Sequence, residues 1–269
     1  MIRCDVVLGI DAAWTPTNPS GVALVTLGGA GWRLVSSHAS YPDFLGGGAN
    51  HTPDAQSLLA QAEQLTGKRV DIVAVDMPLA LSPINGRRPS DNAVSAEYGA
   101  RWCSTHSPSA VRPGPLSDVL TAEFDAAGYP LATAQPTGSA LIEVYPHTAL
   151  VELTRSAKRL EYKVSNAGKY WREEKPVARR CKLVAVWRYI IDHLENEIAG
   201  TAANLNLPDP DAPIKTMKAF EDRLDAVVCA WVGICVLEGK AKPFGDDDSA
   251  TWSPDPRLLT SHFERMSVE

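Results

Sequence analysis

Two short runs of apolar residues in this sequence each end on an aspartate. Residues 6–10 (Val-Val-Leu-Gly-Ile) precede Asp11, and residues 72–75 (Ile-Val-Ala-Val) precede Asp76. Runs of this length that are rich in β-branched residues are typical of buried strands, and parallel α/β sheets carry their chemistry at the carboxyl ends of such strands. Neighbouring strands lie about 4.8 Å apart. We therefore expect the two carboxylates to lie close together, where they repel each other unless they share a cation.

The order of the remaining patterns predicts one α/β fold. Strands are expected over residues 5–11, 21–27, 32–38, 70–76 and 140–145, and helices over residues 53–65, 90–102, 115–127, 148–153, 177–198 and 216–237. Three antiparallel strands followed by parallel strands indicate a mixed sheet with helices on both faces and a helical insertion. We expect a single domain over residues 1–240 with insertions at about 82–138 and 154–212. Residues 241–269 are polar and rich in Asp and Pro, and are expected to form a peripheral tail.

Charge is distributed unevenly along the chain. The formal net charge of −6 and a pI of about 5.6 argue against a protein coated in basic residues for nucleic acid or membrane. Residues 155–188 nevertheless hold eleven Lys or Arg residues and three Glu residues, with Tyr162, Tyr170 and Trp171 among them. This basic stretch is either a surface that tracks a nucleic-acid backbone with stacking or, as the more ordinary alternative, a solvated helical face.

Cysteine usage and hydropathy bear on the compartment. The five cysteines are odd in number and show neither a C-x-x-C pair nor a zinc-like spacing, which favours free thiols in a reducing environment. The N-terminal residues lack the pattern of a signal peptide, and no apolar run approaches the 18 residues that a membrane span needs. We therefore expect a cytoplasmic protein with no membrane partner.

Carboxylates from distant parts of the sequence are expected to meet at one edge of the sheet. Asp11, Asp76 and Glu143 each lie at the end of an expected strand, while Asp222 and Asp225 lie three residues apart on the last helix and so project from one face. Such a set forms a hard oxygen site suited to Mg²⁺ or Mn²⁺. Two such ions about 3.5–4 Å apart activate a water and stabilise the leaving oxygen of a phosphodiester.

Five short motifs in order resemble the family called domain of unknown function 429, whose members are described as ribonuclease H-like nucleases on the basis of their fold. The motifs are Gly-Ile-Asp-Ala-Ala-Trp followed by Ser-Gly-Val-Ala-Leu-Val, then Ala-Val-Asp-Met-Pro-Leu-Ala-Leu, Arg-Arg-Pro-Ser-Asp, Glu-Val-Tyr-Pro-His and Asp-Arg-Leu-Asp-Ala-Val-Val-Cys-Ala-Trp. The similarity spans residues 7–237. It implies a ribonuclease H-like fold with Asp11 on the first strand, Asp76 on the fourth, and Asp225 together with Asp222 on the final helix. Glu143 matches the family's Glu-x-x-Pro motif.

Several of these residues have a second interpretation. Glu143 is either a site carboxylate or the partner of an arginine such as Arg88, and Asp222 is either a ligand or a solvated helix residue. Arg87, Arg88 and Asp91 either grip a phosphate or brace a carboxylate, and Asp91 equally suits the first turn of a helix. Lys163, in the basic stretch, is a further candidate for contact with phosphate or substrate.

Three functions remain open at this point. The leading hypothesis is a metal-dependent nuclease acting on DNA or RNA, with Asp11, Asp76 and Asp225 as ligands and Glu143 as ligand or general base. The second is an ATP-binding phosphotransferase or ATPase of the actin-like class, although residues 14–20 lack the glycine of a phosphate-gripping hairpin. The third is a non-catalytic binding module that keeps the fold.

Overall fold

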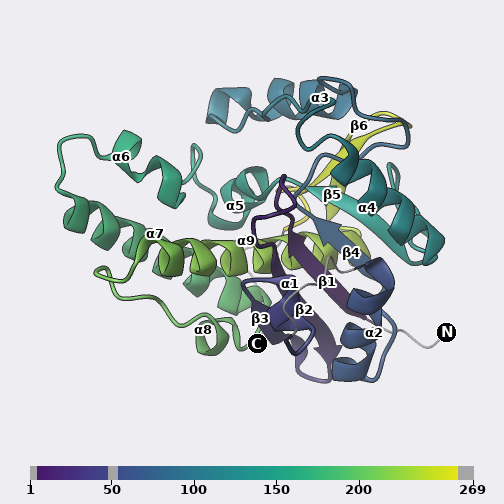
Figure 1. Ribbon diagram of the computed structural model, residues 1–269, viewed down its shortest axis with the longest axis horizontal. Helices are drawn as coiled ribbons and strands as arrows, with labels where there is room; N and C mark the ends of the chain where they lie inside the picture. The colour runs from purple at the N-terminus through teal and green to yellow at the C-terminus, as the bar shows by residue number, and fades with distance from the viewer. Residues whose placement is uncertain (1–4, 48–53, 260–269) are drawn as a thin grey trace.

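A seven-stranded mixed sheet forms the centre of the protein (Figure 1). The computed structural model describes residues 5–47 and 54–259. Its strands are β1 (Val6–Asp11), β2 (Gly21–Gly28), β3 (Gly31–His38), β4 (Ile72–Val75), β5 (Ala140–Val144), β6 (Ala241–Gly245) and β7 (Ala250–Pro254). They lie in the order β3-β2-β1-β4-β5-β7-β6.

Strand direction divides the sheet into two antiparallel ends and a parallel centre. β2 is antiparallel to both β1 and β3, and β6 is antiparallel to β7. The central strands β1, β4, β5 and β7 all run in the same direction. The carboxyl ends of β1, β4 and β5 therefore share one edge of the sheet, as the sequence predicted.

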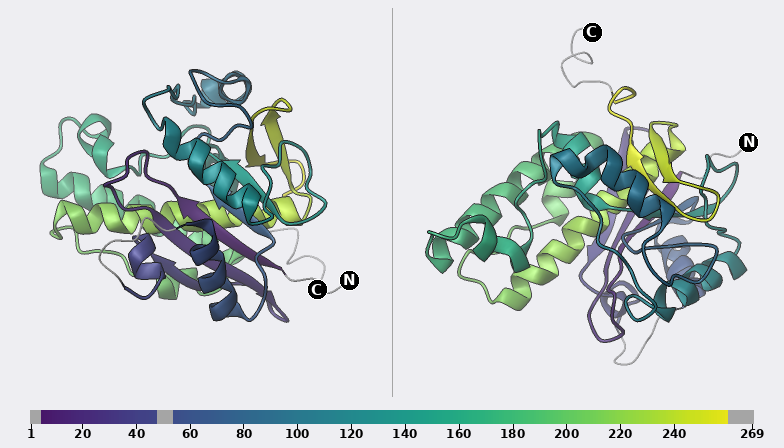
Figure 2. Two further views of the ribbon diagram at one scale, coloured as in Figure 1. Left: turned by 45° about the vertical axis from the view of Figure 1, so that its right-hand side comes forward. Right: turned by 90° about the horizontal axis from the view of Figure 1, so that it is seen from above.

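Helices cover both faces of the sheet. The helices are α1 (Tyr41–Phe44), α2 (Ala55–Thr66), α3 (Pro89–Tyr98), α4 (Pro115–Ala126), α5 (Pro146–Thr154), α6 (Ala167–Tyr170), α7 (Pro176–Glu197), α8 (Thr201–Asn204) and α9 (Ile214–Leu237), with 3₁₀ turns η1 (Gly99–Arg101) and η2 (Val164–Asn166). One apolar core joins α5, α7 and α9 to the sheet, and the other joins α2 and α4 to its opposite face. Figure 2 shows the sheet between these two groups. No helix in the described residues is long and apolar enough to cross a bilayer.

The five strands and six longer helices expected from the sequence are all present within a few residues of their expected bounds. The first helix was expected to start at residue 53, which lies outside the described residues. The expectation of a peripheral tail is wrong for residues 241–254, which form β6 and β7; residues 260–269 lie outside the described part of the chain. The sequence does not predict β7 because polar residues occupy some of its buried positions. Thr251 and Ser253 are buried, but each hydroxyl has a hydrogen-bond partner, Glu143 and Tyr98 respectively.

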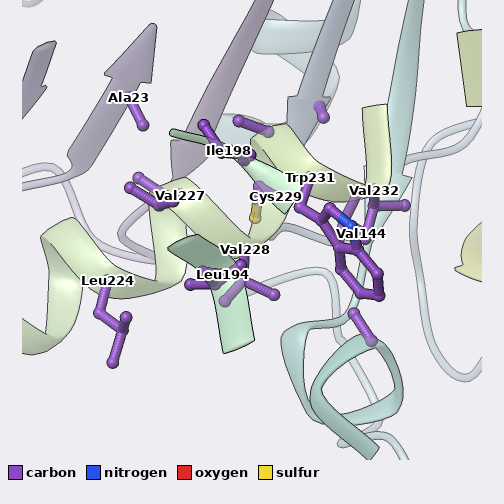
Figure 3. Packing of buried hydrophobic residues seen from close by; sticks show 14 of the residues in the cluster. Ala23, Val144, Leu194, Ile198, Leu224, Val227, Val228, Cys229, Trp231 and Val232 are labelled. Carbon is purple, nitrogen blue, oxygen red and sulfur yellow. The ribbon is translucent and has the colours of Figure 1, made fainter. Parts of the chain in front are cut away.

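Helix α9 packs unusually close to β1 and β2 because two glycines leave room for its backbone. A Cβ at Gly9 would lie 2.2 Å from the carbonyl oxygen of Ala226, and a Cβ at Gly21 would lie 2.0 Å from that of Asp222. Figure 3 shows the apolar side of the same helix, including Val227 and Trp231, in the surrounding core. The close approach fixes the position of the polar residues in the first half of α9 relative to the end of β1.

Candidate active site

Asp11 and Asp76 project from the ends of adjacent parallel strands. Ile10 pairs with Val75, and the backbone N–H of Asp76 donates to the carbonyl of Ile10 at 2.8 Å. Alternation along a strand places Asp11 on the same face as Val7, and Val7 belongs to the core beneath α9. Asp76 shares that face by the same alternation from Ile72. The alternation therefore directs both carboxylates to the α9 side of the sheet. Each of the two residues is partly exposed as a whole.

Helix α9 supplies two further aspartates to the same place. Asp222 and Asp225 are buried, at 4% and 0% exposure, and both act electrostatically on Asp11. The expectation of a solvated position for Asp222 is therefore wrong. Its backbone rests against Gly21 at the start of β2, and Gly21 pairs with Asp11. The geometry of three elements thus brings three aspartates together beside Asp76.

Burial and the neighbouring charges change the proton affinity of Asp11 and Asp76. Burial raises the pKa of Asp11 well above its usual value, and the negative charges of Asp225, Asp76 and Asp222 add to the effect. Burial likewise raises the pKa of Asp76 to about 7, against the opposing effect of Lys163. Both groups are costly to ionise in the protein as it stands, which is the condition under which a bound cation is most stabilising.

Two lysines neutralise the aspartates of α9. The ammonium group of Lys163 contacts Oδ2 of Asp225 and lies 3.7 Å from Oε1 of Glu221. Lys218 contacts Asp222 one helical turn away and donates to Oε1 of Glu221 at 2.9 Å. Burial disfavours both ammonium groups, but the surrounding carboxylates outweigh it and raise the pKa of each lysine. Lys163 therefore lies among the carboxylates themselves rather than on a solvated face.

Tyr162 and a backbone amide complete the polar contacts of this cluster. The Tyr162 hydroxyl donates to Oδ1 of Asp225 at 2.7 Å, and the N–H of Val164 donates to Oε2 of Glu221 at 2.5 Å. His147 packs edge-to-face on Tyr162, and burial together with Arg159 lowers its pKa well below the usual value, so its ring is neutral. The segment that enters η2 thus packs on α9 through one buried and one partly buried hydrogen bond.

Glu143 faces the other side of the sheet from Asp11 and Asp76, although its negative charge still acts on Asp76. It shares the sheet face of Leu141, on the side of α2 and α4, whereas Ala140 and Ile142 face α9. Its Oε1 accepts from Arg88 Nη2 at 2.9 Å and from Thr251 at 2.6 Å. Its Oε2 accepts from the N–H of Leu79 at 2.6 Å and contacts Arg88 Nη1. The carboxylate of Glu143 thus joins β5 and β7 to the loop after β4.

The arginines of the Arg-Arg-Pro-Ser-Asp motif have structural partners. Buried Arg88 bridges Glu143 and Asp91, and Asp91 in turn accepts from the backbone N–H of Arg88 at 2.9 Å, in the first turn of α3. The Arg87 guanidinium bonds to Asn92, Ser95 and the loop that follows η1. In this arrangement both arginines brace the protein, with no donor of Arg88 facing solvent.

Sequence reasoning missed Glu221, Lys218 and the role of Tyr162. Spacing carried part of the signal, since Glu221 and Asp225 are four residues apart on α9, as are Lys218 and Asp222. The remaining contacts depend on how the segment around Lys163 folds back over α9.

The donor chemistry suits a divalent cation, but the lysines compete for it. Carboxylate oxygens are the ligands that Mg²⁺ and Mn²⁺ prefer. Across residues 5–47 and 54–259, no group of three or more His, Cys, Asp or Glu side chains is arranged as a metal site. Asp11 and Asp76 form no ion pair within the described residues, whereas Asp222 and Asp225 each contact an ammonium group. The aspartates of the strands are thus the available ligands.

A comparison with known protein families shows to which family the chain belongs. The family described as "Protein of unknown function (DUF429)" matches residues 9–250, from β1 to the start of β7. The chain belongs to this family. No curated protein and no solved structure matches the chain. The DUF429 match includes Asp11, Asp76 and the whole of α9, so the aspartate cluster lies inside the family region.

Proposed function

We propose that this DUF429 protein is a metal-dependent nuclease with a ribonuclease H-like fold. The observation that carries the proposal is the convergence of Asp11, Asp76, Asp222 and Asp225 at one edge of the sheet, with raised pKa values at Asp11 and Asp76. The order β3-β2-β1-β4-β5, with β2 antiparallel to its neighbours, supports the fold assignment. The positions of Asp11 on the first strand and Asp225 on the last long helix agree with the arrangement that the family resemblance implies.

Asp11 and Asp76 would hold the cation, with Asp222 and Asp225 as further ligands when their lysines move away. A bound Mg²⁺ or Mn²⁺ lowers the pKa of a water and neutralises charge on the phosphate. Lys163 contributes a positive charge beside Asp225, which partly offsets the negative charge of the carboxylates around it. Tyr162 holds the Asp225 carboxylate in a fixed orientation.

The test of this proposal is cleavage of labelled single-stranded and duplex DNA and RNA in Mn²⁺ or Mg²⁺. We expect cleavage by the wild type and its loss in Asp11→Asn, which keeps the side-chain shape but removes the charge. Asp125→Asn is the matched control, because Asp125 is an exposed aspartate on α4. Equal cleavage by wild type and Asp11→Asn, or none with any of these substrates, contradicts the proposal.

A further inference from the structure

Trp102 adopts a left-handed backbone conformation that is unusual for a bulky residue. Its φ is +62° and ψ is 25°, in the left-handed region, and its side chain is 64% exposed. It ends η1 through hydrogen bonds from its own N–H to Gly99 and from the N–H of Cys103 to Tyr98. Glycine is the usual residue at such a position, since a bulky side chain is strained there. An exposed tryptophan therefore occupies a position whose backbone conformation favours glycine.

The turn that carries Trp102 is anchored on both sides. The Arg101 guanidinium donates to Oε1 of Glu152 at 2.6 Å and to the carbonyl of Ser156 at 2.7 Å. On the other side, the Cys103 thiol is buried and contacts the carbonyl of His147 at 3.6 Å. Both anchors lie on or next to α5. The indole is thus presented from a rigid base, as binding surfaces require.

A basic segment lies against this indole. The Lys158 ammonium is 4.5 Å from the centroid of the Trp102 ring, and the N–H of Arg159 donates to the carbonyl of Arg101 at 2.8 Å. Residues 155–163 contain four Lys or Arg residues and one Glu in a chain of net charge −6. Arg155 and Lys158 are exposed. An exposed aromatic ring and exposed cations therefore occur together on an otherwise acidic protein.

The same segment leads directly to the aspartate cluster. Lys163, which contacts Asp225, follows Lys158 by five residues, so their Cα atoms are at most about 18 Å apart. The turn after Trp102 also meets the end of β5, where the Tyr145 hydroxyl donates to the carbonyl of Ser104 at 3.1 Å. The indole is thus within a few nucleotides' reach of the site.

We propose that Trp102 and Lys158 form a platform for single-stranded nucleic acid, on which one base stacks while Lys158 neutralises an adjacent phosphate. Stacking on an aromatic ring next to cations is the mode by which proteins bind single strands without sequence preference. Bases in a duplex are already stacked on each other and do not offer a free face. The inference deepens the proposed nuclease function by naming its substrate class.

The test measures binding rather than cleavage. Fluorescent single-stranded DNA and RNA oligonucleotides are titrated with the Asp11→Asn protein in chelator. The titration is repeated with two double variants, in which Asp11→Asn is combined with Trp102→Ala or with Trp102→Gly. We expect each substitution at Trp102 to weaken binding by about 5- to 150-fold, the range for one stacked base. Val119→Ala, which removes an exposed apolar side chain on α4, is the control and leaves the affinity unchanged.

Thermal unfolding separates binding from folding. Trp102→Gly is expected to unfold at the wild-type temperature or above it, because glycine accepts the left-handed conformation. A structural tryptophan would instead lower the unfolding temperature in the same variant. Unchanged single-strand affinity in both Trp102 variants, equal affinity for a blunt duplex, or no single-strand binding overturns the inference. Binding that depends on Trp102 without cleavage in any metal contradicts the nuclease proposal alone.

Discussion

Lys163 and Asp225 form an ion pair at the centre of the candidate site, and the Asp225 side chain is fully buried. The pair has consequences for both stability and metal binding. A buried carboxylate that already has an ammonium partner is stable without metal, whereas Asp11 and Asp76 have no such partner within the described residues. We infer that lysines neutralise Asp222 and Asp225, and that Asp11 and Asp76 are left as the ligands for a cation.

Substitution of Lys163 should show how much the protein depends on this ammonium group to neutralise Asp225. We expect Lys163→Met to lower the free energy of unfolding by about 3 kcal/mol, because it leaves Asp225 buried beside other carboxylates. Millimolar Mn²⁺ should restore more stability to this variant than it adds to the wild type. Urea unfolding with and without Mn²⁺ measures both effects. Lys182→Met is the control, since its pair with Glu174 is exposed and should change stability by less than about 1 kcal/mol.

The stability of the metal-free protein should fall as the pH rises from about 4 to about 7. Folded Asp76 keeps its proton up to a pH of about 7, whereas an unfolded aspartate loses it near 3.9. Between these values the folded state binds more protons, so raising the pH favours unfolding, by at most about 1.4 kcal/mol per pH unit for each such group. Chemical denaturation in chelator across this range should give a flatter profile for Asp76→Asn. Identical profiles for the two proteins would count against the raised pKa of Asp76.

Glu143 should behave as a structural residue and not as a ligand. Glu143→Gln leaves the buried Arg88 without its full charge partner, and we expect a loss of about 3 kcal/mol in the free energy of unfolding. The rise in unfolding temperature caused by Mn²⁺ should nevertheless remain. Glu174→Gln, on the surface, should leave both quantities close to the wild type. Loss of the Mn²⁺ effect in Glu143→Gln would contradict this prediction and indicate that Glu143 is a metal ligand.

The close packing of α9 on the sheet gives a steric test of the same arrangement. Gly21→Ala places a methyl group 2.0 Å from the carbonyl oxygen of Asp222, so α9 must shift away from β2. We expect a loss of at least about 1–3 kcal/mol in stability together with weaker Mn²⁺ binding. Gly29→Ala, where no atom lies within 4 Å of the added methyl, should have neither effect. Equal stability of the two variants would show that the contact is not tight.

Much of the sheet and part of the site could be predicted from the sequence. The apolar runs before Asp11 and Asp76 specified two strands and their shared edge, since buried parallel strands leave a strong local pattern. Strand β7 could not be found this way, because its buried Thr251 is satisfied by Glu143, a partner 108 residues away.

The alternation of residues along β5 also predicts which face of the sheet Glu143 lies on. Leu141 and Glu143 fall on one face, and Ala140 and Ile142 on the other. The position of Lys163 had no such local signal. It depends on the segment before η2 folding back over α9, through Tyr162 and a backbone amide, and neither contact has a periodic pattern.

The most direct measurement is the thermal unfolding temperature during a Mn²⁺ titration, with chelation as the reverse step. A ligand at 100 times its dissociation constant stabilises a protein by about 2.7 kcal/mol, and each kcal/mol raises the midpoint by roughly 2–4 °C in a chain of this size. We expect such a rise in the wild type, its reversal by chelator, and its absence in Asp11→Asn. An equal rise in Asp11→Asn, or no rise in the wild type at millimolar Mn²⁺, would contradict a cation site at the ends of β1 and β4.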